Sequence, residues 1–229
     1  MTKLRVLLTG FEPYGRRSLN PAFETMRALD GRTFGGAEVI GRALPVSLAK
    51  LRYSLERHLE EIRPQAVISL GLWPGEPMIR LERVAINVAD FEIADNEGSR
   101  PGDSVLAETG AAARLATLPV RAIETALLAE GIPARISSSA GTFLCNACLY
   151  TVLELLEETG RSTVAAGFIH VPYAPAQIAA MLEELRAESV LELHQRADLA
   201  SMDPAMTVRA VEIAVAVTAG GLHGRAAES

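Results

Sequence analysis

Cys145 and His170 combine reactive side chains with positions where a folded chain could expose them. Cys145 follows a predicted strand that ends near Ser138, and it stands at the start of a predicted helix. His170 is the last residue of a predicted strand that begins at Thr163. Functional residues of open α/β sheets gather at the carboxyl ends of strands, so both side chains are expected at one rim of the sheet. A cysteine beside a histidine base predicts nucleophilic thiol catalysis.

The predicted helix start around Cys145 favours a reactive thiol. Thr142 is the expected N-cap, which places Cys145 about three positions into the helix. There, unpaired amide groups and the positive end of the helix dipole would lower the pKa of the thiol. The alternative is that Cys145 is simply a small buried residue, because cysteine is among the most buried residue types.

A second cysteine opens another possibility. Cys145 and Cys148 form a C-x-x-C motif at a helix start, the arrangement of thiol–disulfide oxidoreductases. Redox motifs of that kind normally follow an early strand of a small domain, whereas this one lies well past the middle of the chain. A zinc site would need two further ligands at suitable spacing, and the sequence has no second C-x-x-C and no H-x₃-H. We therefore expect no metal.

The sequence has four histidines, and one of them stands apart as a candidate base. His58 and His194 lie in charged, helical or polar stretches and are expected to be solvated, while His223 is near the C-terminal end. His170 instead emerges from the apolar run 165–169 and is followed closely by Pro172. It is the histidine that we expect to assist Cys145.

A carboxylate should hold such a histidine in its productive tautomer. Glu82 and Asp90 both lie in the extended run 78–91, and their spacing does not choose between them. Each could equally be a solvated carboxylate on a strand.

Composition limits the classes of partner and compartment. The net charge is −6 and no basic stripe is present, which argues against a nucleic-acid partner. No stretch approaches the ~20 apolar residues that span a bilayer, so no membrane partner is expected. The apolar opening is broken by Gly10, Glu12 and Pro13, which is too early for a signal peptide and favours a first strand. Two cysteines in 229 residues form no disulfide framework, so we expect a cytoplasmic protein.

Strand-like and helical segments alternate along the chain. We predict strands at 4–9, 39–46, 66–70, 134–138 and 163–170, an extended run at 78–91, and helices from Asn20-Pro21 and at 48–62, 120–130, 143–159, 175–187 and 204–218. This alternation implies crossover connections and helices on both faces of a largely parallel, mixed and twisted sheet. We expect one α/β domain over residues 1–229, an α/β/α sandwich, with a frayed tail at 224–229.

Four ordered motifs resemble those of the pyroglutamyl peptidase I family of cysteine peptidases, which remove N-terminal 5-oxoproline from peptides. The segments that carry the resemblance are distributed along nearly the whole chain: 8–15 with Asn20-Pro21, Gly71 and 82–87 with 95–98, 141–146 with Tyr150, and 168–173. The likeness continues into the last predicted helix. Four motifs in this order are far more specific than any one of them alone.

The resemblance implies a catalytic triad of Cys145, His170 and Glu82. It further implies a thioacyl intermediate, no cofactor, an N-terminally blocked peptide as substrate, a cytoplasmic location and a homo-oligomer, either a dimer or a tetramer. The residues expected to line the substrate pocket are mostly aromatic or apolar: Phe11, Tyr14, Leu72, Phe143 and Leu144.

Three residues depart from the family pattern near the expected site. Leu72 stands where many members carry a glutamine that recognises the lactam, Arg80 where serine or threonine is usual, and Glu92 where an arginine is common. A leucine cannot replace amide hydrogen bonds, so these departures suggest an altered or relaxed acyl pocket with the triad retained. A non-catalytic relative that binds peptide ends is a further alternative.

Replacing Cys148 with alanine separates the peptidase from the oxidoreductase. A dithiol cycle needs both sulfurs, whereas a peptidase needs one nucleophile. We expect C148A to keep most of the hydrolysis of a pyroglutamyl amide, measured by fluorescence release. Loss of that activity from folded C148A would contradict the single-thiol prediction.

Overall fold

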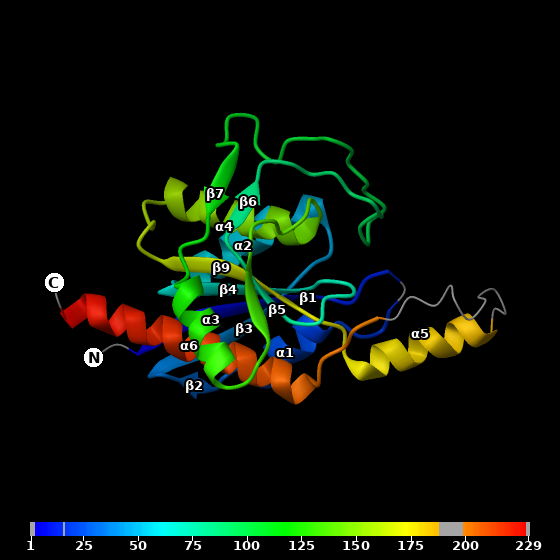
Figure 1. The fold of residues 1–229 in the computed structure, drawn as a ribbon. Coiled ribbons are helices and arrows are strands. Elements are labelled where there is room, and N and C mark those ends of the chain that lie inside the picture. The colour runs from blue at the N-terminus through cyan, green and yellow to red at the C-terminus, as the bar shows by residue number, and fades with distance from the viewer. Residues whose placement is uncertain (1–2, 16, 188–198, 228–229) are drawn as a thin grey trace.

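A seven-stranded sheet forms the centre of the computed structural model, which describes residues 3–15, 17–187 and 199–227 (Figure 1). The strand order is β2-β3-β1-β4-β9-β5-β8. Neighbouring strands pair in parallel except β2 with β3 and β5 with β9, which confirms the predicted mixed, largely parallel sheet. The strands of this sheet are β1 (Leu4–Phe11), β2 (Thr33–Phe34), β3 (Ala37–Leu44), β4 (Ala66–Leu72), β5 (Ile79–Glu82), β8 (Ala134–Ser137) and β9 (Ala165–Val171).

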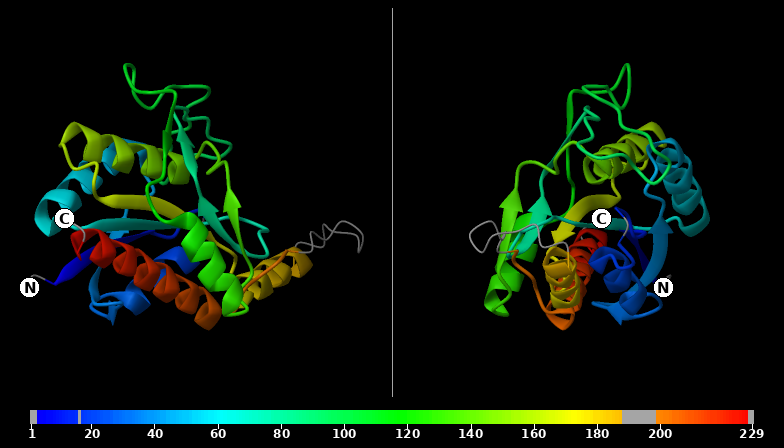
Figure 2. Two further views of the ribbon diagram at one scale, coloured as in Figure 1. Left: turned by 60° about the vertical axis from the view of Figure 1, so that its left-hand side comes forward. Right: turned by 90° about the vertical axis from the view of Figure 1, so that its right-hand side faces the viewer.

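Helices cover both faces of this sheet, as predicted for the sandwich (Figures 1 and 2). On one face lie α2 (Leu48–Ile62) and α4 (Leu144–Glu158), and on the other α1 (Pro21–Leu29), α3 (Val120–Ala129) and α6 (Pro204–Ala227). The helix α5 (Pro175–Ala187) extends away from the sheet. Two short strands, β6 (Val84–Ile86) and β7 (Ala113–Leu115), pair in a separate antiparallel ribbon beside α4.

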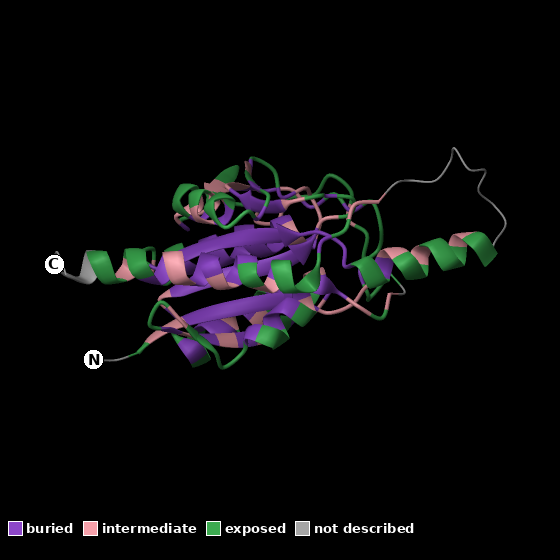
Figure 3. Cartoon of the chain, turned by 60° about the horizontal axis from the view of Figure 1, so that its bottom comes forward, coloured by how far each residue is buried: buried purple, intermediate pink, exposed green. Residues whose placement is uncertain are grey.

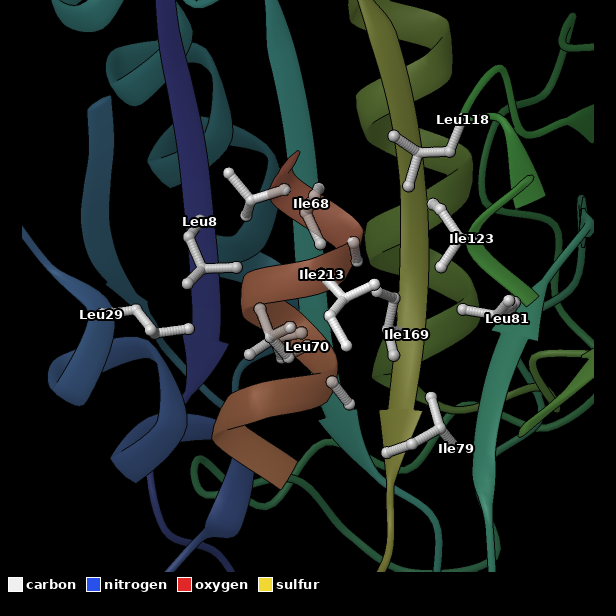
Figure 4. Packing of buried hydrophobic residues seen from close by; sticks show 14 of the residues in the cluster. Leu8, Leu29, Ile68, Leu70, Ile79, Leu81, Leu118, Ile123, Ile169 and Ile213 are labelled. Carbon is white, nitrogen blue, oxygen red and sulfur yellow. The ribbon is translucent and has the colours of Figure 1, made fainter. Parts of the chain in front are cut away.

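Both faces of the central strands are buried, because successive side chains point to opposite sides (Figure 3). Leu8, Ile68 and Ile169 pack toward α1, α3 and α6 (Figure 4). Their chain neighbours Leu7, Val67 and Phe168 pack toward α2 and α4. This explains why the central strands appear in the sequence as continuous apolar runs.

Some of the observed helix and strand boundaries agree with the predictions from the sequence, and others differ from them. The side chain of Asn20 accepts a hydrogen bond from Ala22 N and Pro21 opens α1, as predicted. Helix α4 begins one residue later than predicted, and the hydroxyl of Thr142 donates to Asp90 O instead of capping it. The run 78–91 is also divided, because β5 stays in the main sheet while β6 leaves it to pair with β7.

The last helix differs most from its prediction. Helix α6 continues to Ala227, so residues 224–227 are helical where a frayed tail was expected, and 228–229 lie outside the described residues. Over Pro204–Gly224 it is long and apolar enough to cross a membrane by length and composition alone, which the sequence analysis did not identify. Val211 and Ala214 are fully buried in the cluster that packs on the sheet, which accounts for its apolar composition.

A close approach at Gly10 generates a stability prediction. A Cβ atom there would lie 2.6 Å from the backbone oxygen of Ala22 and 3.1 Å from the Cβ of Met26, so α1 would have to move. We expect Gly10→Ala to lower the free energy of unfolding by roughly 1–3 kcal/mol, measured by urea denaturation. Gly102→Ala is the matched control, because nothing lies within 4 Å of a Cβ at that position. Equal stability of the two variants would contradict the packing described here.

Candidate active site

A cavity of about 390 Å³ opens at the carboxyl ends of β4 and β9 and the start of α4. Cys145 and His170 both line it, so the structure brings the predicted nucleophile and base to one rim of the sheet. All five residues predicted for the substrate pocket line the same cavity: Phe11, Tyr14, Leu72, Phe143 and Leu144.

His170 contacts Glu82 behind this cavity. Its Nδ1 atom lies 2.8 Å from Glu82 Oε1, and the two side chains are 1% and 0% exposed. Strand β5 runs antiparallel to β9, with Arg80 opposite His170 and Glu82 opposite Phe168, which makes Glu82 a diagonal neighbour of His170. Of the two candidate carboxylates, Glu82 is the one that contacts His170, whereas Asp90 is exposed on the cavity rim.

The contact with Glu82 fixes the role that each ring nitrogen can take. With Nδ1–H donating to the carboxylate, Nε2 is the nitrogen that can accept a proton. Burial lowers the pKa of His170, and the hydrogen bond and charge of Glu82 partly oppose this. The imidazole is thus held neutral and able to act as a base at neutral pH.

Cys145 is the second residue of α4 and is partly exposed to the cavity. Gly71 makes room for it, because a Cβ at Gly71 would lie 2.7 Å from Cys145 Sγ and 2.7 Å from Phe168 Cζ. The surrounding atoms raise the pKa of the Cys145 thiol by burial, with smaller contributions from Cys148 and Glu82. From the sequence, the helix start was expected to lower the pKa of this thiol. The structure gives the opposite direction, because desolvation outweighs the effect of the helix start.

Asn146 holds the beginning of α4 in place. Its Nδ2 donates to Ile86 O and Val88 O, both at 2.9 Å, and its Oδ1 accepts from Ile86 N at 2.9 Å. These bonds tie the residue after Cys145 to β6 and the segment that follows it. No separate role was predicted for Asn146 from the sequence. The available signal was an amide side chain directly after the predicted nucleophile, near the start of a predicted helix.

Aromatic rings form the walls of the cavity. Phe143 contacts Phe91 edge to face, with ring centroids 4.5 Å apart, and Tyr14 lies 6.2 Å from Phe143. The rings of Trp73 and His170 are nearly perpendicular, with centroids 4.9 Å apart. Burial raises the pKa of Tyr14, so its hydroxyl stays protonated. The sequence analysis did not predict Trp73 as a lining residue.

Cys148, His58 and His223 do not line the cavity. Cys148 is a fully buried free thiol whose Sγ lies 3.5 Å from Ser69 Oγ, on the sheet side of α4. His58 was predicted to be solvated but is 3% exposed, because it lies on the buried stripe of α2. His223 is exposed on α6, and His194 lies outside the described residues.

Comparison with known proteins connects this geometry to an enzyme family. The family model described as pyroglutamyl peptidase matches residues 4–220. The pyrrolidone-carboxylate peptidase of Thermococcus litoralis is 47% identical over 174 residues, 76% of this chain and 79% of that protein. The one from Klebsiella pneumoniae is 45% identical over 175 residues, covering 76% and 81%.

Solved structures agree over nearly the whole chain. The pyrrolidone carboxyl peptidase from Thermococcus litoralis superposes with a TM-score of 0.88 at 41% identity, covering 98% of this chain and 96% of that one. The E192D variant from Pyrococcus furiosus gives a TM-score of 0.87 at 38% identity, covering 96% and 100%.

The raised thiol pKa predicts how Cys145 responds to pH in the absence of substrate. A pKa above its ordinary value keeps the thiolate fraction small at neutral pH, so alkylation by iodoacetamide should accelerate about tenfold per pH unit with no plateau below pH 8. Mass spectrometry of the modified peptide measures the rate. Cys145→Ser is the control, since buried Cys148 should then react only slowly. A plateau already at pH 6 would contradict the neutral thiol.

Proposed function

Because the chain belongs to the pyroglutamyl peptidase family and removes N-terminal pyroglutamate from peptides, we propose that Cys145, His170 and Glu82 are its catalytic triad. The observation that carries this proposal is the enclosed 2.8 Å contact between Glu82 and His170 behind the cavity that Cys145 lines. Cys145 is the nucleophile, His170 the general base and acid, and Glu82 the carboxylate that orients the imidazole.

The two perturbed pKa values suit a proton transfer at the moment of attack. The thiol and the imidazole are both neutral in the free enzyme, because burial raises the first pKa and lowers the second. As Sγ attacks the pyroglutamyl carbonyl, His170 takes the thiol proton and then gives it to the leaving amine of the peptide. A thioester on Cys145 remains.

The same histidine completes the cycle. After the peptide leaves, His170 removes a proton from water, which attacks the thioester carbonyl and releases pyroglutamate and the free thiol. Glu82 stabilises the imidazolium that forms in each step, because its carboxylate accepts from Nδ1–H.

The lining of the cavity suits a small ring with little charge. Phe11, Tyr14 and Phe143 contribute apolar surface, and Leu72 is only 9% exposed at the carboxyl end of β4. The comparisons give no support to the altered acyl specificity that the sequence suggested from Leu72 and Glu92. Glu92 lines the cavity as an exposed residue.

The compartment and assembly of the protein are further parts of this proposal. A nucleophilic thiol in a chain with two cysteines suits the reducing cytoplasm. The resemblance favours a homo-oligomer, a dimer or tetramer, and α5 projects from the sheet as a surface that a second copy could contact (Figure 2).

Glu82 and Asp90 provide a matched test of the proposed triad. We expect Glu82→Gln to lower kcat/KM for a pyroglutamyl fluorogenic amide by about 10²-fold or more, because the imidazole loses its orienting carboxylate. Cys145→Ser should lose about 10³-fold or more. Asp90→Asn removes the other candidate carboxylate and should stay close to the wild type. Full activity in Glu82→Gln, or an equal loss in Asp90→Asn, would exclude the assigned role of Glu82.

A further inference from the structure

A buried arginine lies directly behind the proposed triad. The side chain of Arg80 is 8% exposed, and its Nε donates to Glu82 Oε1 at 3.1 Å. Its Nη1 donates to Glu76 Oε2 at 3.3 Å, and its Nη2 donates to Ser137 Oγ at 2.7 Å and to Ser139 O at 2.8 Å. The guanidinium is therefore held in one orientation by partners on every side.

Glu82 Oε1 is shared between this arginine and the catalytic histidine. It lies 2.8 Å from His170 Nδ1 and 3.1 Å from Arg80 Nε, while Oε2 has no hydrogen-bond partner in the described part of the chain. The position of the carboxylate facing His170 is thus set by two donors on one oxygen. Without Arg80, a fully buried carboxylate would keep a single partner.

The arginine also contacts a wall of the cavity. Its guanidinium carbon lies 3.7 Å from the ring centroid of Trp73, and the planes of the Trp73 and His170 rings meet at 80°. The backbone of Gly141 also approaches the indole, since a Cβ at that position would lie 3.4 Å from Trp73 Cζ3. Arg80 therefore supports both the carboxylate and the aromatic ring that flank the imidazole.

We propose that Arg80 is a positioning residue of this peptidase, which holds Glu82 against His170 and fixes Trp73 beside the imidazole. The proposal rests on the triad assigned above. Arg80 does not line the cavity, so it acts through these two neighbours and does not touch the substrate.

The charges around His170 give the proposal a consequence for pH dependence. Glu82 and Arg80 face it from β5, Glu76 from the segment before β5, and Cys145 from α4. Tyr14, Asp90 and Glu92 line the same cavity. Besides burial, the positive charge of Arg80 lowers the pKa of His170, whereas Glu82 and Glu76 raise it. Removal of Arg80 should therefore let the imidazole be protonated at a higher pH.

The test is the pH profile of kcat/KM for a pyroglutamyl fluorogenic amide, measured for the wild type, Arg80→Met and Arg80→Lys. In Arg80→Met the acid limb should move up by about one pH unit, so that activity on the acid side of both limbs falls about tenfold relative to the wild type and recovers toward it at high pH. Arg80→Lys keeps the charge but loses the fork of donors, so its acid limb should stay in place while kcat falls.

Arg135→Gln is the matched control. Arg135 donates to the same Glu76 Oε2 at 2.7 Å, but its side chain is 50% exposed and makes no hydrogen bond to Glu82. The Arg135→Gln variant should have the same acid limb and the same kcat as the wild type. A shift in Arg135→Gln as large as that in Arg80→Met would overturn the specific role of Arg80.

The variants distinguish failure of the Arg80 proposal from misfolding and from failure of the proposed triad. A cooperatively folded Arg80→Met with an unchanged acid limb would overturn the proposal, and an inactive Glu82→Gln beside it would leave the triad intact. If Arg80→Met does not fold, the measurement on Arg80→Lys tests the proposal. A lower kcat with an unshifted acid limb would support the proposal, and a kcat equal to that of the wild type would overturn it.

Discussion

The buried contact between Glu82 and His170 is the constraint on which the site depends. A carboxylate that is 0% exposed must be paired, because leaving a charge unpaired in the protein interior costs several kcal/mol. Arg80 and Glu82 lie two residues apart on β5, so both side chains are on the same face of that strand. The antiparallel pairing of β5 with β9 puts Arg80 opposite His170, which sets this face beside the histidine near the end of β9.

Burial at this end of the sheet also determines the protonation states of Cys145 and His170. Burial raises the pKa of Cys145 and lowers that of His170, so neither group is charged before the substrate arrives. In the proposed mechanism, the Glu82 carboxylate stabilises the positive charge that appears on the imidazole when it takes the thiol proton. Gly71 belongs to this arrangement as well, because any larger residue there would displace the sulfur. The three residues of the proposed triad therefore lie within the packed end of the sheet, with the Cys145 thiol on the side that faces the cavity.

Local patterns in the sequence predicted most of the helices and strands and singled out two residues of the proposed triad, Cys145 and His170. Helix α2 was predicted with its observed bounds because its apolar stripe is a local pattern, and the structure adds a cap at Ser47. The same stripe places His58 between Leu55 and Ile62, so its burial could have been deduced from spacing. The choice of Glu82 over Asp90 depends on the pairing of β5 with β9, 88 residues apart, and no local pattern contains it. The continuation of α6 depends in the same way on tertiary contacts, since Leu222 packs on the core.

The most direct test of the account is identification of the covalent intermediate. A reaction with a pyroglutamyl ester would be quenched in acid within milliseconds, digested and sequenced by tandem mass spectrometry. We predict a pyroglutamyl thioester on Cys145 and an unmodified Cys148, with the adduct absent from Cys145→Ser. An adduct on Cys148, or turnover of the ester by Cys145→Ser, would contradict the mechanism.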